Sequence, residues 1–133
     1  MRQFHLEIVT PDGLEFDGMA ESLLTRTDDG DVEILAGHAD LIATVGIGRT
    51  RIISGGKTVF ASSAGGFLSV KGGEVRLVTV TFELQDDIDL ERAKRAKERA
   101  EELLKSKSGE KDIRIAKAKL ARALNRINVA NMK

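Results

Sequence analysis

Ile88-Asp89-Leu90-Glu91-Arg92-Ala93 marks the point at which the composition of this chain changes. Twelve of the 13 glycines and all five phenylalanines precede this stretch, whereas one glycine and no aromatic residue follow it. The segment that follows is rich in Ala, Leu, Lys and Arg, which are strong helix formers. We therefore expect two parts, residues 1–86 and residues 87–133, that are built in different ways.

The first part contains short apolar stretches separated by glycine-rich turns. Residues 3–10 alternate, with Phe4, Leu6 and Ile8 on one face, which is the period of a half-buried strand. Gly-Gly pairs at 55–56 and 72–73 predict tight hairpins. Strands that recur about every eight to twelve residues are typical of a β-sandwich or a flattened barrel, which we expect over residues 2–84.

The residues after Asp86 follow a helical period. Asp87 or Asp89 can cap a first helix, and a loop over residues 106–112 leads into a second, so an antiparallel hairpin is expected. The two apolar stripes are Ala93, Ala96, Ala100, Leu103 and Leu104, and Ile113, Ala116, Leu120, Ala123, Ile127 and Ala130. Alanine buries little area, so we expect the contact between the helices to be weaker than the helices themselves. Whether the hairpin moves stays open at this point.

The zero net charge of the chain hides an asymmetry. Residues 1–86 carry 7 Lys and Arg against 13 Asp and Glu, and residues 87–133 carry 14 against 8. Residues 113–133 contain six basic residues and no acidic one. A basic helix of this kind can dock on an acidic protein, on anionic lipid or on nucleic acid. The lack of aromatic residues in it disfavours the last two.

Several kinds of chemistry are disfavoured by the residues present. The chain has no cysteine, and its two histidines lack partners at metal-ligand spacing. The end of a phosphate-binding loop at residues 54–58 has Arg51 where the first glycine is required, and a strand rather than a helix follows. No apolar run approaches the ~20 residues of a membrane span. Membrane contact is therefore expected only through a protein partner.

The arginines of the expected hairpin form a candidate anion site. Arg92 and Arg99 share one helix face, as do Arg122 and Arg126, and a turn near Gly109 places Arg92 opposite Arg126. Guanidinium groups about 8 Å apart repel each other by about 1 kcal/mol, and a bound polyphosphate would reverse that sign. The alternative is a solvated basic face paired with neighbouring glutamates.

Five motifs in order along the chain resemble the epsilon subunit of bacterial F-type ATP synthase. They are VTPDG at 9–13, GDVEILAGHADL at 30–41, GGFLSV at 65–70, IDLERA at 88–93 and RALNR at 122–126. The resemblance implies an α+β, mainly β chain: a ten-stranded β-sandwich over residues 1–86, followed by an antiparallel two-helix hairpin over residues 87–133.

The resemblance also implies a non-catalytic rotor subunit that couples the gamma subunit to the membrane c-ring. In such a subunit the helical arm restrains ATP hydrolysis when ATP is scarce, and its basic helix reaches the catalytic alpha/beta head. ATP is implied as a regulatory ligand that is not turned over, and the need for Mg²⁺ is left open. The implied location is peripheral, at the cytoplasmic face of the bacterial plasma membrane, with no direct membrane insertion and no nucleic-acid partner.

Two sets of residues carry these implied functions. The implied ATP contacts are Glu83, Ile88, Asp89, Arg92, Ala93, Arg99, Arg122 and Arg126, with the arginines on the phosphates and with Ile88 and Ala93 beside the adenine. Asp31 and His38 are the implied contacts to the ring or the gamma subunit. The resemblance places both in a loop from Asp28 to Asp40, where Glu33 and Ala36 stand at positions at which the family usually has glycine and proline.

Three rival readings remain. A purely structural rotor subunit with an immobile hairpin predicts no ATP binding. A nucleotide-hydrolysing enzyme predicts phosphate release by the isolated chain. A nucleic-acid binder predicts salt-sensitive binding to DNA.

Overall fold

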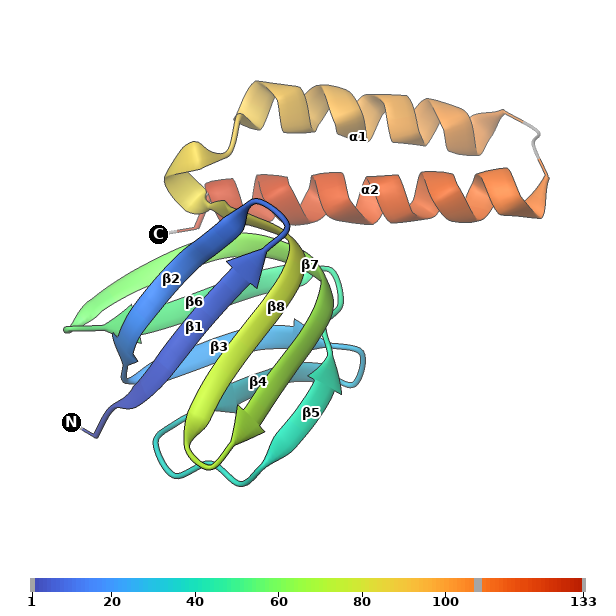
Figure 1. Cartoon of the computed structure of the whole chain (residues 1–133). Helices are drawn as coiled ribbons and strands as arrows, with labels where there is room; N and C mark the ends of the chain where they lie inside the picture. Colours follow the sequence, from blue (N-terminus) through green and yellow to red (C-terminus); the bar gives the residue numbers. More distant parts are fainter. Residues whose placement is uncertain (1, 107–108, 133) are drawn as a thin grey trace.

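The computed structural model of this chain describes residues 2–106 and 109–132 and has a β-sandwich with a helical hairpin lying across one end (Figure 1). The strands are β1 (Phe4–Thr10), β2 (Gly13–Ala20), β3 (Ser22–Thr27), β4 (Gly30–Ile34), β5 (Leu41–Thr44), β6 (Gly48–Ser54), β7 (Lys57–Lys71) and β8 (Glu74–Leu84). A 3₁₀ turn, η1 (Gln85–Asp87), leads into α1 (Leu90–Lys105) and α2 (Glu110–Ala130). Lys107 and Ser108 of the expected loop, and Lys133 of the expected basic helix, lie outside the described residues.

One continuous ladder joins the strands in the order β2-β1-β8-β7-β6-β3-β4, and β5 pairs with β7. β1 runs parallel to β8, and the other pairs are antiparallel. Ala20 of β2 and Ile34 of β4 come from opposite ends of this order, yet both belong to the same buried core. The sheet therefore folds over on itself and makes both layers of the sandwich.

The predicted fold class is confirmed, but the sandwich has eight strands rather than ten. Gly65 and Gly66 have φ angles of +77° and +98°. Glycine adopts such angles both at a break between two strands and at a bend within one strand. β7 nevertheless stays paired with β8 on both sides of them. Its first half pairs with β6 and its second half with β5. The two glycines therefore bend a long strand without dividing it.

The alternation predicted in β1 is confirmed. Phe4, Leu6 and Ile8 are buried, and the residues between them are half-buried. Because successive side chains of a strand point to opposite faces, this pattern directs the three apolar residues into the core. The hairpin turns predicted at Gly55-Gly56 and Gly72-Gly73 are also present, and residues 36–40 form a loop between β4 and β5.

His5 joins three neighbouring strands on the outside of the sandwich. Its Nε2 lies 2.5 Å from Asp17 of β2, and its Nδ1 lies 2.6 Å from Glu74 of β8. A protonated imidazole donates from both nitrogens, so both carboxylates favour the charged form. The hydrogen bonds, first to Asp17 and then to Glu74, raise the pKa of His5 from the usual 6.5 to about 8.

We predict that this cluster makes folding stability depend on pH. A pKa raised in the folded state gives a contribution that is fully present below pH 6.5 and is lost as the pH rises through about 8. The urea midpoint of the chain should therefore fall between about pH 6 and about pH 9, and the slope should be smaller in His5→Gln. The same slope in both proteins would show that His5 does not cause it.

The hairpin follows most of its predicted period, but Leu103 of the predicted apolar stripe is 47% exposed and Val129, which lies outside that stripe, is buried. Asp89 caps α1, because its carboxylate accepts a hydrogen bond of 3.0 Å from the backbone N–H of Arg92. The buried residues of the two helices are Ala93, Ala100, Ala116, Ala123 and Val129. α2 lies between α1 and the sandwich, and it packs on β6 and β7 (Figure 1). The seam between the helices is therefore made almost wholly of alanine. Within residues 2–106 and 109–132, no helix is long and apolar enough to cross a bilayer.

Candidate ligand-binding site

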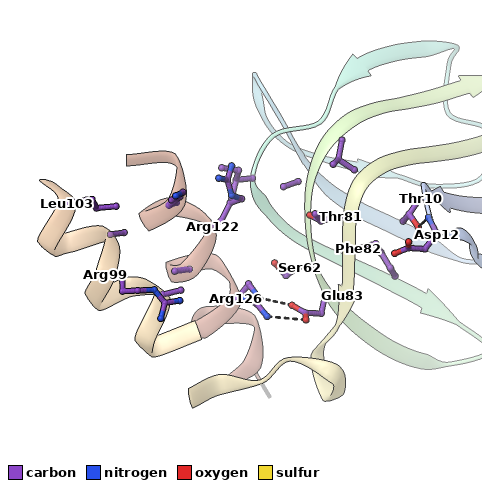
Figure 2. Close-up of a pocket in the computed structure, with 17 residues that line it drawn as sticks. Thr10, Asp12, Ser62, Thr81, Phe82, Glu83, Arg99, Leu103, Arg122 and Arg126 are labelled. Atoms are coloured by element: carbon purple, nitrogen blue, oxygen red, sulfur yellow. Dashed lines mark hydrogen bonds and ion pairs between the residues drawn. The ribbon is translucent and has the colours of Figure 1, made fainter. Parts of the chain in front are cut away.

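A cavity of about 650 Å³ lies between the hairpin and the sandwich (Figure 2). A volume of roughly 300–1,000 Å³ is usual for small-molecule sites. Ala96 and Ala100 of α1 and Ala123 of α2 line it. These small side chains keep the helices close together but leave space between the hairpin and the sandwich. The same alanines that make the seam thin therefore help to make room for a ligand.

The two walls of the cavity differ in chemistry. The sandwich wall presents the apolar side chains of Ile47, Val80 and Phe82 together with several hydroxyl groups. The hairpin wall presents four cationic side chains, which are Arg99, Lys119, Arg122 and Arg126. Acidic groups on the cavity lining are Glu83 and Asp12. This combination favours a ligand with an apolar portion and several negative charges.

Glu83 and Arg126 join the two walls by a two-pronged ion pair. Arg126 Nε donates to Glu83 Oε1 at 2.7 Å, and Nη2 donates to Oε2 at 3.1 Å, as the dashed lines in Figure 2 show. Both side chains are mostly buried, with exposed fractions of 26% and 32%. Within the described ranges 2–106 and 109–132, Arg99, Lys119 and Arg122 have no ion pair. Their charge is therefore available to a ligand.

The structure divides the eight sequence-predicted ligand contacts into two groups. Glu83, Arg99, Arg122 and Arg126 line the cavity, and Ile88, Asp89, Arg92 and Ala93 do not. Asp89 is occupied as the cap of α1, and Ala93 is completely buried. Arg92 lies one helical turn before Ala96, toward η1, so it falls beyond the end of the cavity. The expected group of four arginines thus contributes three to this cavity.

Lys119 borders the cavity but was not singled out from the sequence. In the sequence it is one of the six basic residues of residues 113–133. Its position three residues before Arg122 and seven before Arg126 places it on the same helix face, which is a signal that could have identified it. Which face of α2 meets the sandwich is not visible in the helical period.

Asn125 is a second residue that the sequence reading missed. Its Nδ2 donates to the carbonyl oxygen of Gly48 and to Oγ of Ser62, at 2.9 Å each. Gln85 of η1 donates to the carbonyl oxygens of Val129 and Met132 at the end of α2. Together with the Glu83–Arg126 pair, these bonds hold α2 on the sandwich. The docking contact is therefore rich in polar interactions.

Asp31 and His38 lie in different settings. Asp31 of β4 pairs with Arg26 at 3.5 Å and with Arg49 at 3.4 Å, and it borders a second, smaller hollow of about 230 Å³ beside the end of α2. His38 lies in the loop between β4 and β5, where its Nδ1 is 2.6 Å from the carbonyl oxygen of Ala39. No hydrogen bond or ion pair in the described part of the chain joins the two residues. Their predicted contact with a partner stays a prediction.

Within residues 2–106 and 109–132, no group of three or more His, Cys, Asp or Glu side chains is arranged to hold a metal ion.

A β-sandwich and a helical hairpin that together line one cationic cavity define a two-part protein whose candidate site draws on both parts. Comparison with known families identifies the family to which the chain belongs. Residues 3–85 match the beta-sandwich domain of the ATP synthase delta/epsilon chain, and residues 86–131 match the long alpha-helix domain of the same chain. The chain belongs to the epsilon-chain family of the F-type ATP synthase, whose members are stalk subunits rather than catalytic ones.

Named relatives cover nearly the whole chain. The ATP synthase epsilon chain of Bacillus velezensis is 41% identical over 130 residues, which is 98% of each chain. The epsilon chain of Ruminiclostridium cellulolyticum is 38% identical over 131 residues, again 98% of each.

Solved structures share the fold. A chain in the mitochondrial ATP synthase of Euglena gracilis, in a structure of OSCP, F1 and the c-ring, matches with a TM-score of 0.84 and 25% identity over 92% of this chain and 78% of that one. A chain in the central stalk and c-ring of the Tetrahymena thermophila enzyme matches with a TM-score of 0.68 over 98% of each chain, and its 12% identity supports the fold alone.

Proposed function

We propose that this chain is a rotor subunit of a bacterial F-type ATP synthase, that it couples the gamma subunit to the c-ring, and that its hairpin senses ATP. With ATP bound in the cavity the hairpin stays docked on the sandwich. Without ATP it extends toward the alpha/beta head and inhibits hydrolysis. ATP is a sensed ligand in this proposal, and the chain acts peripherally at the cytoplasmic face of the plasma membrane. Family membership and solved stalk and c-ring relatives support the assembly.

One observation carries the sensing proposal: the cavity has one wall on the sandwich and the other on the hairpin. A ligand that contacts both walls binds the docked form and loses its contacts with the hairpin when the hairpin leaves. Such a ligand stabilises docking by an amount that grows with the logarithm of its concentration once that concentration exceeds the Kd. Triphosphate charge would also relieve the repulsion among Arg99, Arg122 and Lys119, which have no ion pair within the described residues.

The contacts that hold the hairpin together and on the sandwich are suited to reversible docking. The helix–helix seam buries mainly alanine, and the docking of α2 relies on Asn125, Gln85 and the Arg126–Glu83 pair. Hydrogen bonds exchanged for bonds to water contribute only about 0.5–1.5 kcal/mol each. The core cluster of the sandwich draws on residues of its own strands and the adjoining loops, so undocking leaves that core intact.

We predict that Arg122→Ala weakens ATP binding by about 10- to 100-fold, because a hydrogen-bonded charge pair with phosphate contributes about 1.5–3 kcal/mol. Calorimetric titration of the full chain with ATP measures this. Arg114→Ala is the matched control, since it removes an exposed arginine from the same helix that does not line the cavity.

Two results would contradict the proposal that ATP binds within this cavity. Equal affinity in the native chain and in Arg122→Ala would show that ATP does not bind there. A loss in Arg92→Ala as large as that in Arg122→Ala would show that the bound site extends beyond the cavity to the start of α1. No ATP binding by the native chain would favour a purely structural rotor subunit.

A further inference from the structure

The last turn of α2 contains no basic residue that could offset the dipole of the helix. The C-terminal end of a helix carries about half a negative elementary charge. Arg126, just before this turn, is held by Glu83. Gln85 donates to the carbonyl oxygens of Val129 and Met132, but it is a neutral donor. A cation supplied by the sandwich would therefore stabilise the docked position of this end.

Two arginines of the sandwich lie beside the end of α2. Arg26 of β3 and Arg49 of β6 line the smaller hollow, and Asn125, Asn128 and Met132 line it from the hairpin side. The exposed fractions of the two arginine side chains are 51% and 40%. Both guanidinium groups can therefore change direction within the hollow.

Gly48 shows how closely these groups approach one another. Its carbonyl oxygen accepts the hydrogen bond of 2.9 Å from Asn125, and the next residue along β6 is Arg49. A Cβ atom at position 48 would lie 2.3 Å from the Cβ of Arg26, so the stem of Arg26 lies directly against this glycine. One of the contacts that hold α2 on the sandwich is thus adjacent to both arginines.

Asp31 of β4 lies in the same hollow and attracts both arginines. Its Oδ1 is 3.5 Å from Arg26 Nη1, and its Oδ2 is 3.4 Å from Arg49 Nη1. Among residues 2–106 and 109–132, neither arginine has another ion pair, and no hydrogen bond joins Asp31 to either of them. One carboxylate therefore offsets only one of two positive charges, through contacts that are long for an ion pair.

We propose that Arg26 and Arg49 form an electrostatic docking site for the C-terminal end of α2, and that Asp31 sets the strength of this site. The charged carboxylate of Asp31 draws both guanidinium groups and reduces their attraction to the helix end. When a cationic group of a binding partner pairs with Asp31, the arginines are released and hold the hairpin more firmly. This inference rests on the proposed function only in taking the docking of the hairpin to be reversible.

Amide hydrogen exchange of the full chain at low salt tests the inference, with the core strands as the internal reference. Arg49→Gln should make exchange in the last turns of α2 about two- to fivefold faster, because a cation at a helix C-terminus has an effect of this size. Asp31→Asn, which reproduces neutralisation by a partner's cation, should make it slower by a similar factor. High salt should reduce both effects.

Two variants are matched controls. Arg51 follows Arg49 on the same face of β6 but does not line the hollow, so Arg51→Gln should leave the exchange of α2 unchanged relative to the core. Asp29 is an exposed acidic residue two positions before Asp31, with no ion pair in the described part of the chain, so Asp29→Asn should also have no effect. In a chain that carries both Arg26→Gln and Arg49→Gln, Asp31→Asn should lose most of its effect, because it acts through the arginines.

The outcomes separate this inference from the proposed function. Unchanged exchange in Arg49→Gln, or an equal effect in Arg51→Gln, would show that the hollow is not the docking site. Unchanged or faster exchange in Asp31→Asn would show that Asp31 does not weaken docking. Either result overturns the inference and leaves the ATP site as proposed, since no nucleotide is present. Exchange of α2 in the native chain as slow as that of the core strands would contradict reversible docking itself.

Discussion

Gly66→Ala should lower the free energy of unfolding of this chain by more than about 3 kcal/mol, a loss large enough to leave much of the protein unfolded. A Cβ atom at this position would lie 1.8 Å from the carbonyl oxygen of Val78 and 2.8 Å from its carbonyl carbon. Both atoms belong to the backbone of β8, so they cannot move aside without breaking the pairing with β7. The φ angle of +98° adds conformational strain.

Gly72→Ala is the matched control for this prediction. Gly72 also has a positive φ, of +57°, but a Cβ atom there meets nothing within 4 Å. Its cost should be limited to the left-handed conformation, about 1 kcal/mol. Urea denaturation followed by circular dichroism compares the two variants, and failure of Gly66→Ala to fold agrees with the prediction. A loss in Gly66→Ala no larger than that in Gly72→Ala would contradict it.

Asn125→Ala should release the hairpin from the sandwich. The change removes the two hydrogen bonds to Gly48 and Ser62 and leaves their partly buried oxygens without this donor. A loss of about 1–3 kcal/mol would shift the docking equilibrium by roughly 5- to 150-fold. The apparent ATP affinity should fall by the fraction of chain that is no longer docked, because only the docked form has a complete cavity.

Two measurements check the release of the hairpin. Amide hydrogen exchange of the isolated chain should become faster in α2 and remain slow in the core strands. In the assembled ATP synthase, hydrolysis at a given ATP concentration should be inhibited more strongly. Asn128→Ala is the control, since Asn128 is an exposed residue of the same helix with no hydrogen bond in the described part of the chain. Unchanged hydrolysis together with faster exchange would favour a hairpin without a regulatory role.

Docking and ligand binding are linked in this structure through geometry. The hairpin holds most of the cationic groups, and the sandwich supplies Glu83 and the apolar wall. The Arg126–Glu83 pair joins the hairpin to the sandwich, and its formation does not require a ligand. It therefore supports a docked form that ATP can bind, while Arg99, Lys119 and Arg122 provide the charge by which ATP shifts the population.

Local sequence signals predicted strands and helices well where a single hydrophobic period or a single helix-capping residue decided the local structure. The alternation in β1 predicted which side chains are buried, and Asp89 was a correct choice for the cap of α1. The alanine stripes predicted the thin seam. The strand count was wrong because a Gly-Gly pair allows both a bend and a break, and only the neighbouring strand β8 decides between them at Gly65 and Gly66.

The candidate site could be predicted only in part. The helical period placed Arg122 and Arg126 on one face, and both line the cavity. It did not show that Arg92 lies a turn outside the cavity, that Lys119 lies inside it, or that Arg126 is bound by Glu83, 43 positions away in sequence. Asp31 likewise proved to be held by Arg26 and Arg49, which come from β3 and β6.

The sequence by itself determined most of the strand and helix positions, which faces are apolar, and that the hairpin is basic, because these properties depend on residues a few positions apart. Its motifs also determined the family. Only the tertiary structure decided that the sheet folds over on itself, that α2 rather than α1 packs on it, and that Glu83 and Asn125 connect the two parts. These outcomes depend on how two surfaces fit together, and no local period encodes which helix face meets which strands.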